Sequence, residues 1–337
     1  MPRQIAISVT ESSQIGEARR AGISMAESQQ LGKTESGRVA IIAMELATNL
    51  SRYAQNGILI LRADIDAFGR KMVEVLAVDS GPGFDPKFCM VDGYSTGGTP
   101  GHGLGAVQRL ATTFDFYTST KTGSVVLAQL CERGYTHASG GTRYGCVSLP
   151  APRETVCGDA WKFIAGENGS GACIVADGLG HGPGAAEASE AAIDVFAHNH
   201  RATGQEFFKA CHQRLTPTRG AAVAVAQLDF QRETLHYTAV GNIAGTLLSQ
   251  TSRRGLFSHN GTVGVALNRS KTFEYPLAGS NMLVMCSDGL QTRWTLDAYP
   301  GLSRKHPALT AAVLHRDYCR SRDDVTVLAV SWGTDSA

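Results

Sequence analysis

The stretch at residues 173–182 reads CIVADGLGHG. It begins with four apolar or small residues, as a buried strand does, and continues with an aspartate and a run in which every second residue is glycine, which marks a turn. An aspartate at the start or end of an apolar run recurs at Asp159, at Asp288 and at the pair Asp323 and Asp324. One such aspartate commonly belongs to an ordinary turn. Four of these positions in one region indicate a shared site.

The region around these aspartates predicts a β-sandwich flanked by helices. Short apolar runs alternate with turn residues, which is typical of many short strands packed in two sheets under a few helices. We expect strands at 143–149, 157–165, 171–177, 221–229, 233–240, 244–249, 272–277, 281–287 and 325–332, and helices at 183–198, 204–214 and 305–316.

The first part of the chain predicts a different unit, so the fold class is α+β. We expect strands at 5–9, 58–65, 71–78, 113–120 and 123–130, and helices at 11–31, 36–53 and 104–112, with Ser36 as the cap of the second helix. A chain of 337 residues exceeds the usual size of one domain. We therefore expect one domain at 1–131, a linker at 132–142 and a second domain at 143–333.

Three motifs in the first domain point to nucleotide chemistry. Glu45 and Asn49 lie four residues apart and share a helix face, and an amide oxygen such as that of Asn49 can ligate Mg²⁺. The sequence DSGPG at 79–83 follows a strand, where the Asp79 carboxylate could accept a hydrogen bond from an exocyclic amine. The sequence GHGLG at 101–105 opens a helix whose amides could receive phosphate.

Plainer interpretations of these motifs stay open. The sequence at 79–83 is also that of an ordinary turn, and Glu45 could be a solvated carboxylate paired with Arg38 or Arg52. The order and spacing of the three motifs favour the nucleotide interpretation.

The aspartates of the second domain supply the oxygen ligands that hard divalent cations require. Two such ions held about 3.5–4 Å apart activate a water and neutralise a phosphoryl group. The sequence therefore predicts a two-metal site for phosphate-ester hydrolysis.

Composition excludes several other classes. The formal net charge is +1, which gives no drive toward nucleic acid or anionic membranes. No apolar stretch approaches the roughly 20 residues of a membrane span, and the N-terminus lacks the apolar core of a signal peptide, so we expect a cytoplasmic protein. The eight cysteines include no C-x-x-C pair and read as reduced, structural thiols.

The motifs of residues 5–130 resemble the GHKL ATPase superfamily, and within it the small RsbT-like serine kinases of bacterial partner-switching modules. The resemblance implies an α/β sandwich that binds ATP with Mg²⁺. It implies that Glu45 is the general base, that Asn49 ligates Mg²⁺ and that Asp79 contacts adenine. The remaining implied nucleotide-binding residues are Gly81, Gly83, Gly101, Gly103, Leu104 and Gly105.

Residues 143–333 resemble the SpoIIE and RsbX-like branch of the metal-dependent protein phosphatases, the PPM family. The resemblance implies two Mn²⁺ or Mg²⁺ ions, flanked or bridged by Asp159 and Asp177. It also implies that the Gly178 carbonyl, Asp288 and Asp323 complete the site, with Asp324 competing with Asp323. His181 could act as an acid or could be a structural turn residue.

Together the two resemblances imply a bifunctional regulator that phosphorylates and dephosphorylates a STAS-domain antagonist of an anti-sigma factor, alongside other partner-switching components. A second hypothesis keeps the phosphatase and treats the first domain as an ATP-controlled docking or regulatory module. A third, non-enzymatic hypothesis treats both domains as scaffolds.

Overall fold

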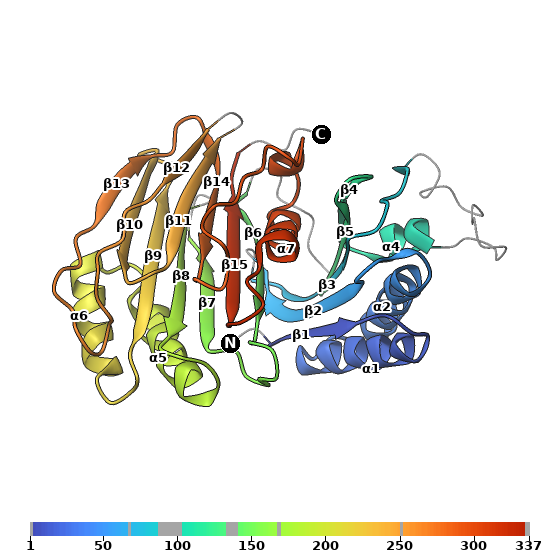
Figure 1. Ribbon diagram of the computed structural model, residues 1–337, viewed down its shortest axis with the longest axis horizontal. Coiled ribbons are helices and arrows are strands. Elements are labelled where there is room, and N and C mark those ends of the chain that lie inside the picture. The colour runs from blue at the N-terminus through green and yellow to red at the C-terminus, as the bar shows by residue number, and fades with distance from the viewer. Residues whose placement is uncertain are drawn as a thin grey trace. The chain divides into compact units, whose positions relative to one another are not determined.

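The computed structural model describes residues 3–66, 69–86, 103–132, 141–166, 170–249 and 252–333 (Figure 1). The chain divides into two compact units, one of residues 2–137 and one of residues 138–337. Gly101, most of the expected linker and part of the turn at 67–70 lie outside the described residues. Within the described residues, no helix combines the length and apolar character needed to cross a membrane.

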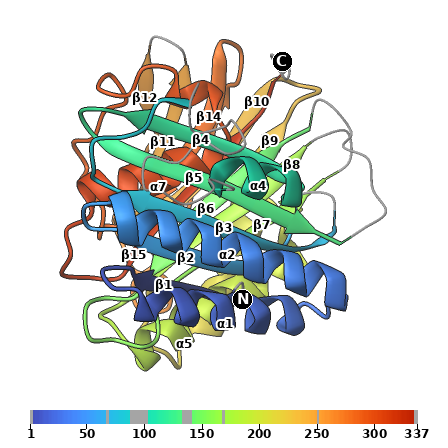
Figure 2. The same cartoon turned by 90° about the vertical axis from the view of Figure 1, so that its right-hand side faces the viewer.

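The first unit is an antiparallel five-stranded sheet with its helices on one face (Figure 2). The sheet order is β1-β2-β3-β5-β4. The strands are β1 Arg3–Ser8, β2 Ile58–Ile65, β3 Lys71–Asp79, β4 Thr113–Ser119 and β5 Gly123–Cys131, and the helices are α1 Ser13–Ser28, α2 Lys33–Tyr53 and α4 Gly103–Leu110.

The core of this unit lies between α2 and the sheet. Leu46 and Leu50 of α2 are buried against Leu61 of β2 and Val75 of β3. The opposite sheet face contains a buried polar row, in which Arg62 Nε donates to Glu74 Oε1 at 3.0 Å and Gln129 Nε2 donates to Glu74 Oε2 at 2.7 Å. Both faces of β3 are thus buried, which explains why its sequence is nearly continuously apolar.

The second unit consists of two five-stranded sheets, as the sequence predicts. Their orders are β13-β10-β9-β8-β7 and β12-β11-β14-β15-β6. The first contains β7 Asp159–Ala165, β8 Gly171–Gly178, β9 Ala221–Asp229, β10 Thr234–Val240 and β13 Phe273–Pro276. The second contains β6 Arg143–Leu149, β11 Ala244–Ser249, β12 Arg253–Gly255, β14 Ser280–Cys286 and β15 Val325–Ser331.

Helices cover the outer faces of this sandwich (Figure 1). Helices α5 Pro183–Asn199 and α6 Gly204–Leu215 bury Phe196, Phe207 and Phe208 against the first sheet. Helix α7 Pro307–Tyr318 packs on β6 and β15, and the 3₁₀ turn η2 Leu302–Arg304 precedes it. Between the sheets, Cys173 Sγ of β8 lies 3.6 Å from Met285 Sδ of β14.

Three expectations from the sequence are wrong in detail. Ser36 does not cap the second helix, because α2 begins at Lys33 with Gly32 in the cap position and Ser36 inside the first turn. Asp159 is the first residue of β7, so this strand begins two residues later than the expected strand at 157–165. The short strand β12 and the 3₁₀ turn were not expected from the sequence. Each has only three residues, and β12, which consists of two arginines and a glycine, shows no alternation of apolar residues.

Packing of α7 on the second sheet predicts the outcome of one substitution. A Cβ added to Gly145 of β6 would lie 2.2 Å from Ala308 Cα in the first turn of α7, so the helix could not keep its place. We expect Gly145→Ala to lower the free energy of unfolding by about 2 kcal/mol, as overpacking commonly does. Urea denaturation of the full chain measures it. Gly255→Ala is the control, because no atom lies within 4 Å of its added Cβ; equal midpoints for the two variants would contradict the prediction.

Candidate functional site

The first group of predicted site residues lies on α2 and at the start of α4. Glu45 and Asn49 are both half-buried on α2, one turn apart. A Cβ added to Gly103 would lie 3.8 Å from both the Oδ1 and the Nδ2 of Asn49. The N-terminal end of α4 therefore lies beside the Asn49 amide, as the nucleotide interpretation requires.

Asp79 ends β3 and shapes the glycine turn that follows it. Its Oδ1 accepts a hydrogen bond of 2.7 Å from the Gly81 amide, and the Ser80 amide donates to Gln55 O at 2.9 Å. Gly83 has a φ of +70°, and a Cβ there would lie 2.8 Å from Ser119 O. The segment is thus a true turn, and it also fixes Asp79 at the strand end. The two interpretations are compatible.

Two hydroxyl residues next to Asp79 escaped sequence reasoning. Ser124 of β5 pairs directly with Asp79, and its Oγ lies 3.1 Å from Thr118 Oγ1 of β4. Thr118 Oγ1 also accepts the Phe84 amide at 2.9 Å. The available signal was a buried serine at the start of the apolar strand β5.

Of the four nucleotide-binding residues predicted at 101–105, three lie within the described residues, and their surroundings differ. Leu104 is buried in the core between helices and sheet, so only its backbone is available to a ligand. Gly105 is buried, and Gly103 is half-buried at the start of α4. Gly101 lies outside the described residues.

In the second unit, the structure brings together Asp159 and Asp177. They are directly opposite each other in the antiparallel pair β7 and β8. Asp159 is 1% exposed, and its Oδ2 accepts a hydrogen bond of 2.6 Å from Ser287 Oγ. Ser287 Oγ in turn accepts the Thr326 amide at 2.9 Å, which links the first sheet to the second. Ser287 is not among the residues that the sequence predicts for this site.

Burial and mutual repulsion raise the pKa values of these carboxyls. Burial is the main cause at Asp177, whose pKa rises to about 9, and the charges of Asp159 and Asp288 add to it. Burial also raises the pKa of Asp159, to about 7, although the Ser287 hydrogen bond opposes the rise. The charges of Asp323 and Asp324 raise the pKa of Asp177 as well. All five predicted aspartates therefore belong to one electrostatic site.

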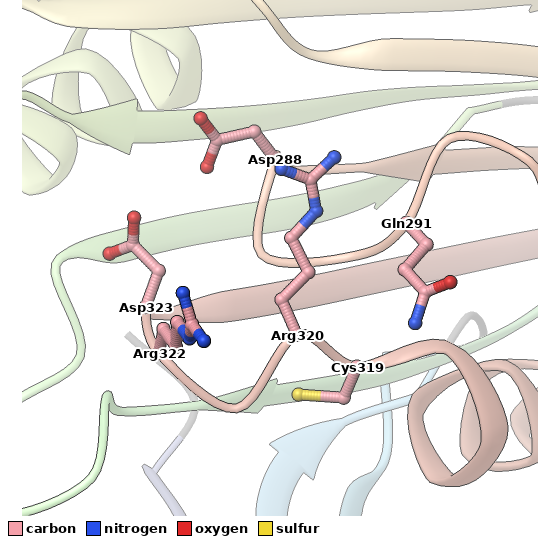
Figure 3. Close-up of a pocket in the computed structure, with 6 residues that line it drawn as sticks. All are labelled: Asp288, Gln291, Cys319, Arg320, Arg322 and Asp323. Atoms are coloured by element: carbon pink, nitrogen blue, oxygen red, sulfur yellow. The ribbon is translucent and has the colours of Figure 1, made fainter.

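Asp288 and Asp323 line a cavity of about 460 Å³ (Figure 3). The other lining residues are Gln291, Cys319, Arg320 and Arg322. Asp288 Oδ2 accepts a hydrogen bond of 2.7 Å from Asn242 Nδ2, which holds the carboxylate from the β10–β11 connection. The cavity thus opens beside two of the predicted metal ligands.

Asp324 differs from its neighbour Asp323. It is 3% exposed, and its Oδ1 accepts the Ala151 amide at 2.8 Å. Burial raises its pKa, while hydrogen bonds from the backbone of Ala151 and Gly158 lower it. Asp324 thereby ties the β6–β7 connection to the start of β15, a structural task that Asp323 does not share.

Glycines beside the aspartates allow the strand ends to meet. A Cβ on Gly178 would lie 2.0 Å from Ala185 O of α5, and one on Gly289 would lie 2.1 Å from Asp324 O. A Cβ on Gly158 would lie 2.5 Å from Asp324 Oδ2. These three glycines are needed for space, because each lies against another part of the site.

His181 lies in the loop that leads into α5. Its Nδ1 is 2.7 Å from Glu154 Oε1, and its side chain is 62% exposed. The positive charge of a protonated His181 lowers the pKa of Asp324, so the ring is close to the acidic site. The Glu154 contact holds the ring in place and is compatible with either role expected for it.

The donor set of this site fits hard divalent cations. The five carboxylates and the Gly178 carbonyl are oxygen donors of the kind such cations need, and cations would relieve the repulsion that raises the pKa values. As placed in the described residues, no three His, Cys, Asp or Glu side chains close around a single ion position.

Two family models match this chain in agreement with the two units. The histidine kinase-like ATPase domain matches residues 8–130, and Stage II sporulation protein E (SpoIIE) matches residues 167–333.

Two proteins of Bacillus subtilis (strain 168) are similar to it. The serine/threonine-protein kinase RsbT is 31% identical over 129 residues, which are 38% of this chain and 96% of RsbT. The phosphoserine phosphatase RsbX is 30% identical over 90 residues, which are 27% of this chain. That match spans 45% of the length of RsbX.

Solved structures show the same sandwich. A chain from the bacterial stressosome, described as a modular system that has been adapted to control secondary messenger signaling, is 27% identical with a TM-score of 0.52 over 56% of this chain and 98% of that one. RsbX crystallised with magnesium is 22% identical with a TM-score of 0.50 over 60% of this chain and 99% of that one, a likeness of fold.

The agreement of motifs, strand-end geometry and family matches identifies both units. The chain belongs to the histidine kinase-like ATPase family through an RsbT-like domain, and this domain is fused to a SpoIIE-type, RsbX-like domain of the PPM phosphatases.

Proposed function

We propose that this protein adds a phosphate to a serine or threonine of a STAS-domain partner and also removes it. The observation that carries the proposal is that one chain contains both an RsbT-like domain, with Asn49 beside the start of α4, and a five-aspartate site at the strand ends of a PPM fold. RsbT and RsbX are a kinase and a phosphatase by name, which supports opposite actions on one partner-switching system.

The kinase half relies on positioning. The Asn49 amide oxygen would hold Mg²⁺ of the nucleotide, and the amides at the start of α4 would bind phosphate oxygens. Asp79 would accept a hydrogen bond from the adenine amine. Glu45, one turn before Asn49, would take the proton from the attacking hydroxyl, while charge stabilisation supplies most of the catalysis.

The phosphatase half relies on the carboxylates. Asp159, Asp177, Asp288 and Asp323, with the Gly178 carbonyl, would hold the divalent cations, which supply an activated water and neutralise the phosphoryl charge. Ser287 would orient Asp159 through its hydrogen bond of 2.6 Å. We assign the ligand to Asp323 rather than Asp324, because Asp323 lines the cavity and Asp324 accepts the Ala151 amide.

The assignment of Asp323 predicts a difference between two adjacent substitutions. Asp323→Asn removes a direct ligand charge, so we expect Mn²⁺ affinity to fall by at least about 100-fold, which is the upper end of what loss of a mere outer-shell partner costs. Asp324→Asn keeps an oxygen that can accept the Ala151 amide, so we expect Mn²⁺ affinity within about fivefold of the parent and an unfolding midpoint no lower than that of the parent. Calorimetric titration with Mn²⁺ compares the two. Greater loss of affinity in Asp324→Asn would reverse the assignment.

Asp177→Asn separates the two activities. Asp177 faces the common site from β8 and is not part of the ATP-binding unit. We expect loss of at least about 1,000-fold in Mn²⁺-dependent hydrolysis of p-nitrophenyl phosphate, in the range of removing one key transition-state contact. Binding of a non-hydrolysable ATP analogue should be unchanged. Hydrolysis within twofold of the parent protein would refute the metal site.

Glu45→Gln tests the kinase half. We expect it to slow phosphate transfer to the STAS partner by about 100-fold or more, as loss of a general base does, while ATP binding stays within about twofold. Radiolabelled transfer is measured in an Asp177→Asn background, so that the phosphatase cannot remove the product. Glu35→Gln on the same helix is the matched control. If the Asp177→Asn background transfers no phosphate, the first domain is a regulatory module instead.

A further inference from the structure

We propose that Arg320 and Arg322 bind the phosphate of the substrate, and that the cavity they line receives a phosphoserine or phosphothreonine side chain only after the divalent cations have bound. The proposal rests on the phosphatase function proposed above and adds two substrate-binding residues to it.

Arg320 and Arg322 lie beside the proposed metal ligands. The two arginines line the same cavity of about 460 Å³ as Asp288 and Asp323, which we assign to the metal site. Figure 3 shows the Arg320 side chain extending toward the loop that carries Asp288. A phosphate held by these guanidiniums would therefore lie beside the ions that act on it.

The backbone that carries the two arginines is hydrogen-bonded to the loop that follows Asp288. The Arg320 amide donates to Gly289 O at 2.8 Å, and the Gln291 amide donates to Tyr318 O at 2.9 Å. Leu290 and Cys319 form an isolated β-bridge between these segments. Ser321 then takes a φ of +53° between the two arginines. Such support keeps a binding residue in register with the ligands on the adjacent loop.

The guanidiniums of Arg320 and Arg322 are both available to bind a phosphate. Among the described residues, neither forms an ion pair or a side-chain hydrogen bond, and both residues are exposed. Three other arginines of this unit are engaged: Arg232 with Asp229, Arg253 with backbone carbonyls of Thr292 and Trp294, and Arg316 with Asp317. A guanidinium presents a planar set of donors that matches phosphate oxygens two at a time.

The net charge of the cavity lining predicts that divalent cations bind before phosphate. Two aspartates and two arginines give the cavity lining a formal charge of zero. Without cations, the carboxylates would repel a phosphate dianion as strongly as the arginines attract it. Divalent cations on the carboxylates leave the lining positive, so phosphate binding should depend on them.

The lining also indicates the kind of phosphoester. The six residues include no aromatic ring, and the two uncharged ones, Gln291 and Cys319, are polar or small. The wall therefore offers no aromatic ring on which a phosphotyrosine ring or a base could stack, and the proposal commits its two guanidiniums to the phosphate. The cavity fits the short side chain of a phosphoserine or phosphothreonine.

The test compares three forms of the full chain at saturating Mn²⁺: the parent, the double variant Arg320→Gln with Arg322→Gln, and Arg232→Gln. Arg232 is the matched control, because it lies past the far end of β9, roughly 25 Å from the site at the strand rise of about 3.3 Å. We expect the double variant to raise both the KM for a phosphoserine peptide and the inhibition constant of inorganic phosphate at least about tenfold. Its kcat should stay within about threefold, and its Mn²⁺ affinity should not fall, because the substitutions remove positive charge from beside the carboxylates.

Arg320→Lys with Arg322→Lys distinguishes recognition from mere charge. Lysine keeps the positive charge but lacks the planar paired donors of a guanidinium. We therefore expect the KM and the inhibition constant of phosphate to lie between those of the parent and the glutamine variant. Values for the glutamine variant within twofold of the parent, in an active enzyme, would overturn the proposal.

Alkylation of the Cys319 thiol gives a readout independent of turnover. Peptide mass spectrometry follows its rate in the parent protein with Mn²⁺, with phosphate and with both. We expect phosphate to slow the reaction only when Mn²⁺ is present, and not in the glutamine variant. If the parent hydrolyses no phosphopeptide but shows this protection, the cavity assignment stands and the phosphatase proposal fails. Equal protection in the parent and the glutamine variant would overturn the cavity assignment.

Discussion

Repulsion among buried carboxylates is the constraint on which the second unit depends. Asp159 and Asp177 face each other across β7 and β8, where burial and neighbouring aspartates raise both pKa values. Folding therefore places negative groups together at a cost that bound cations offset. The Ser287 hydroxyl joins Asp159 to β15, so both sheets are held around the same charges. Such a cluster of carboxylates would attract divalent cations before any substrate binds.

The first unit depends instead on the placement of single polar side chains and backbone amides. The turn after β3 fixes Asp79, and the start of α4 lies beside Asn49. A phosphorylated serine or threonine adds roughly −1.5 to −2 charges to a partner, which is enough to change an interface. With both units in one chain, the balance of the two activities would set the phosphorylated fraction of that partner. ATP supply would act on the kinase side of this balance alone, whereas divalent cations would act on both sides.

The sequence predicts the two units, most strand positions and the aspartate set, because apolar periodicity and strand-end acids are local signals. It does not predict why the glycines beside those aspartates are required. Gly158, Gly178 and Gly289 read as turn residues, but each is needed because another strand, helix or carboxylate lies against it. Contacts of this kind join residues far apart in the chain. The choice between Asp323 and Asp324 also depended on a distant partner, the Ala151 amide.

The central claim is that the two units act in opposite directions on one residue of one partner. The most direct measurement incubates the purified chain with ATP, Mg²⁺, Mn²⁺ and a STAS-domain protein, and then removes ATP with a scavenging enzyme. Mass spectrometry locates and quantifies the phosphate through both phases. The account predicts that one serine or threonine gains phosphate while ATP is present and loses it afterwards. Phosphate that appears on one residue and is removed only from another, or that never appears, would contradict it.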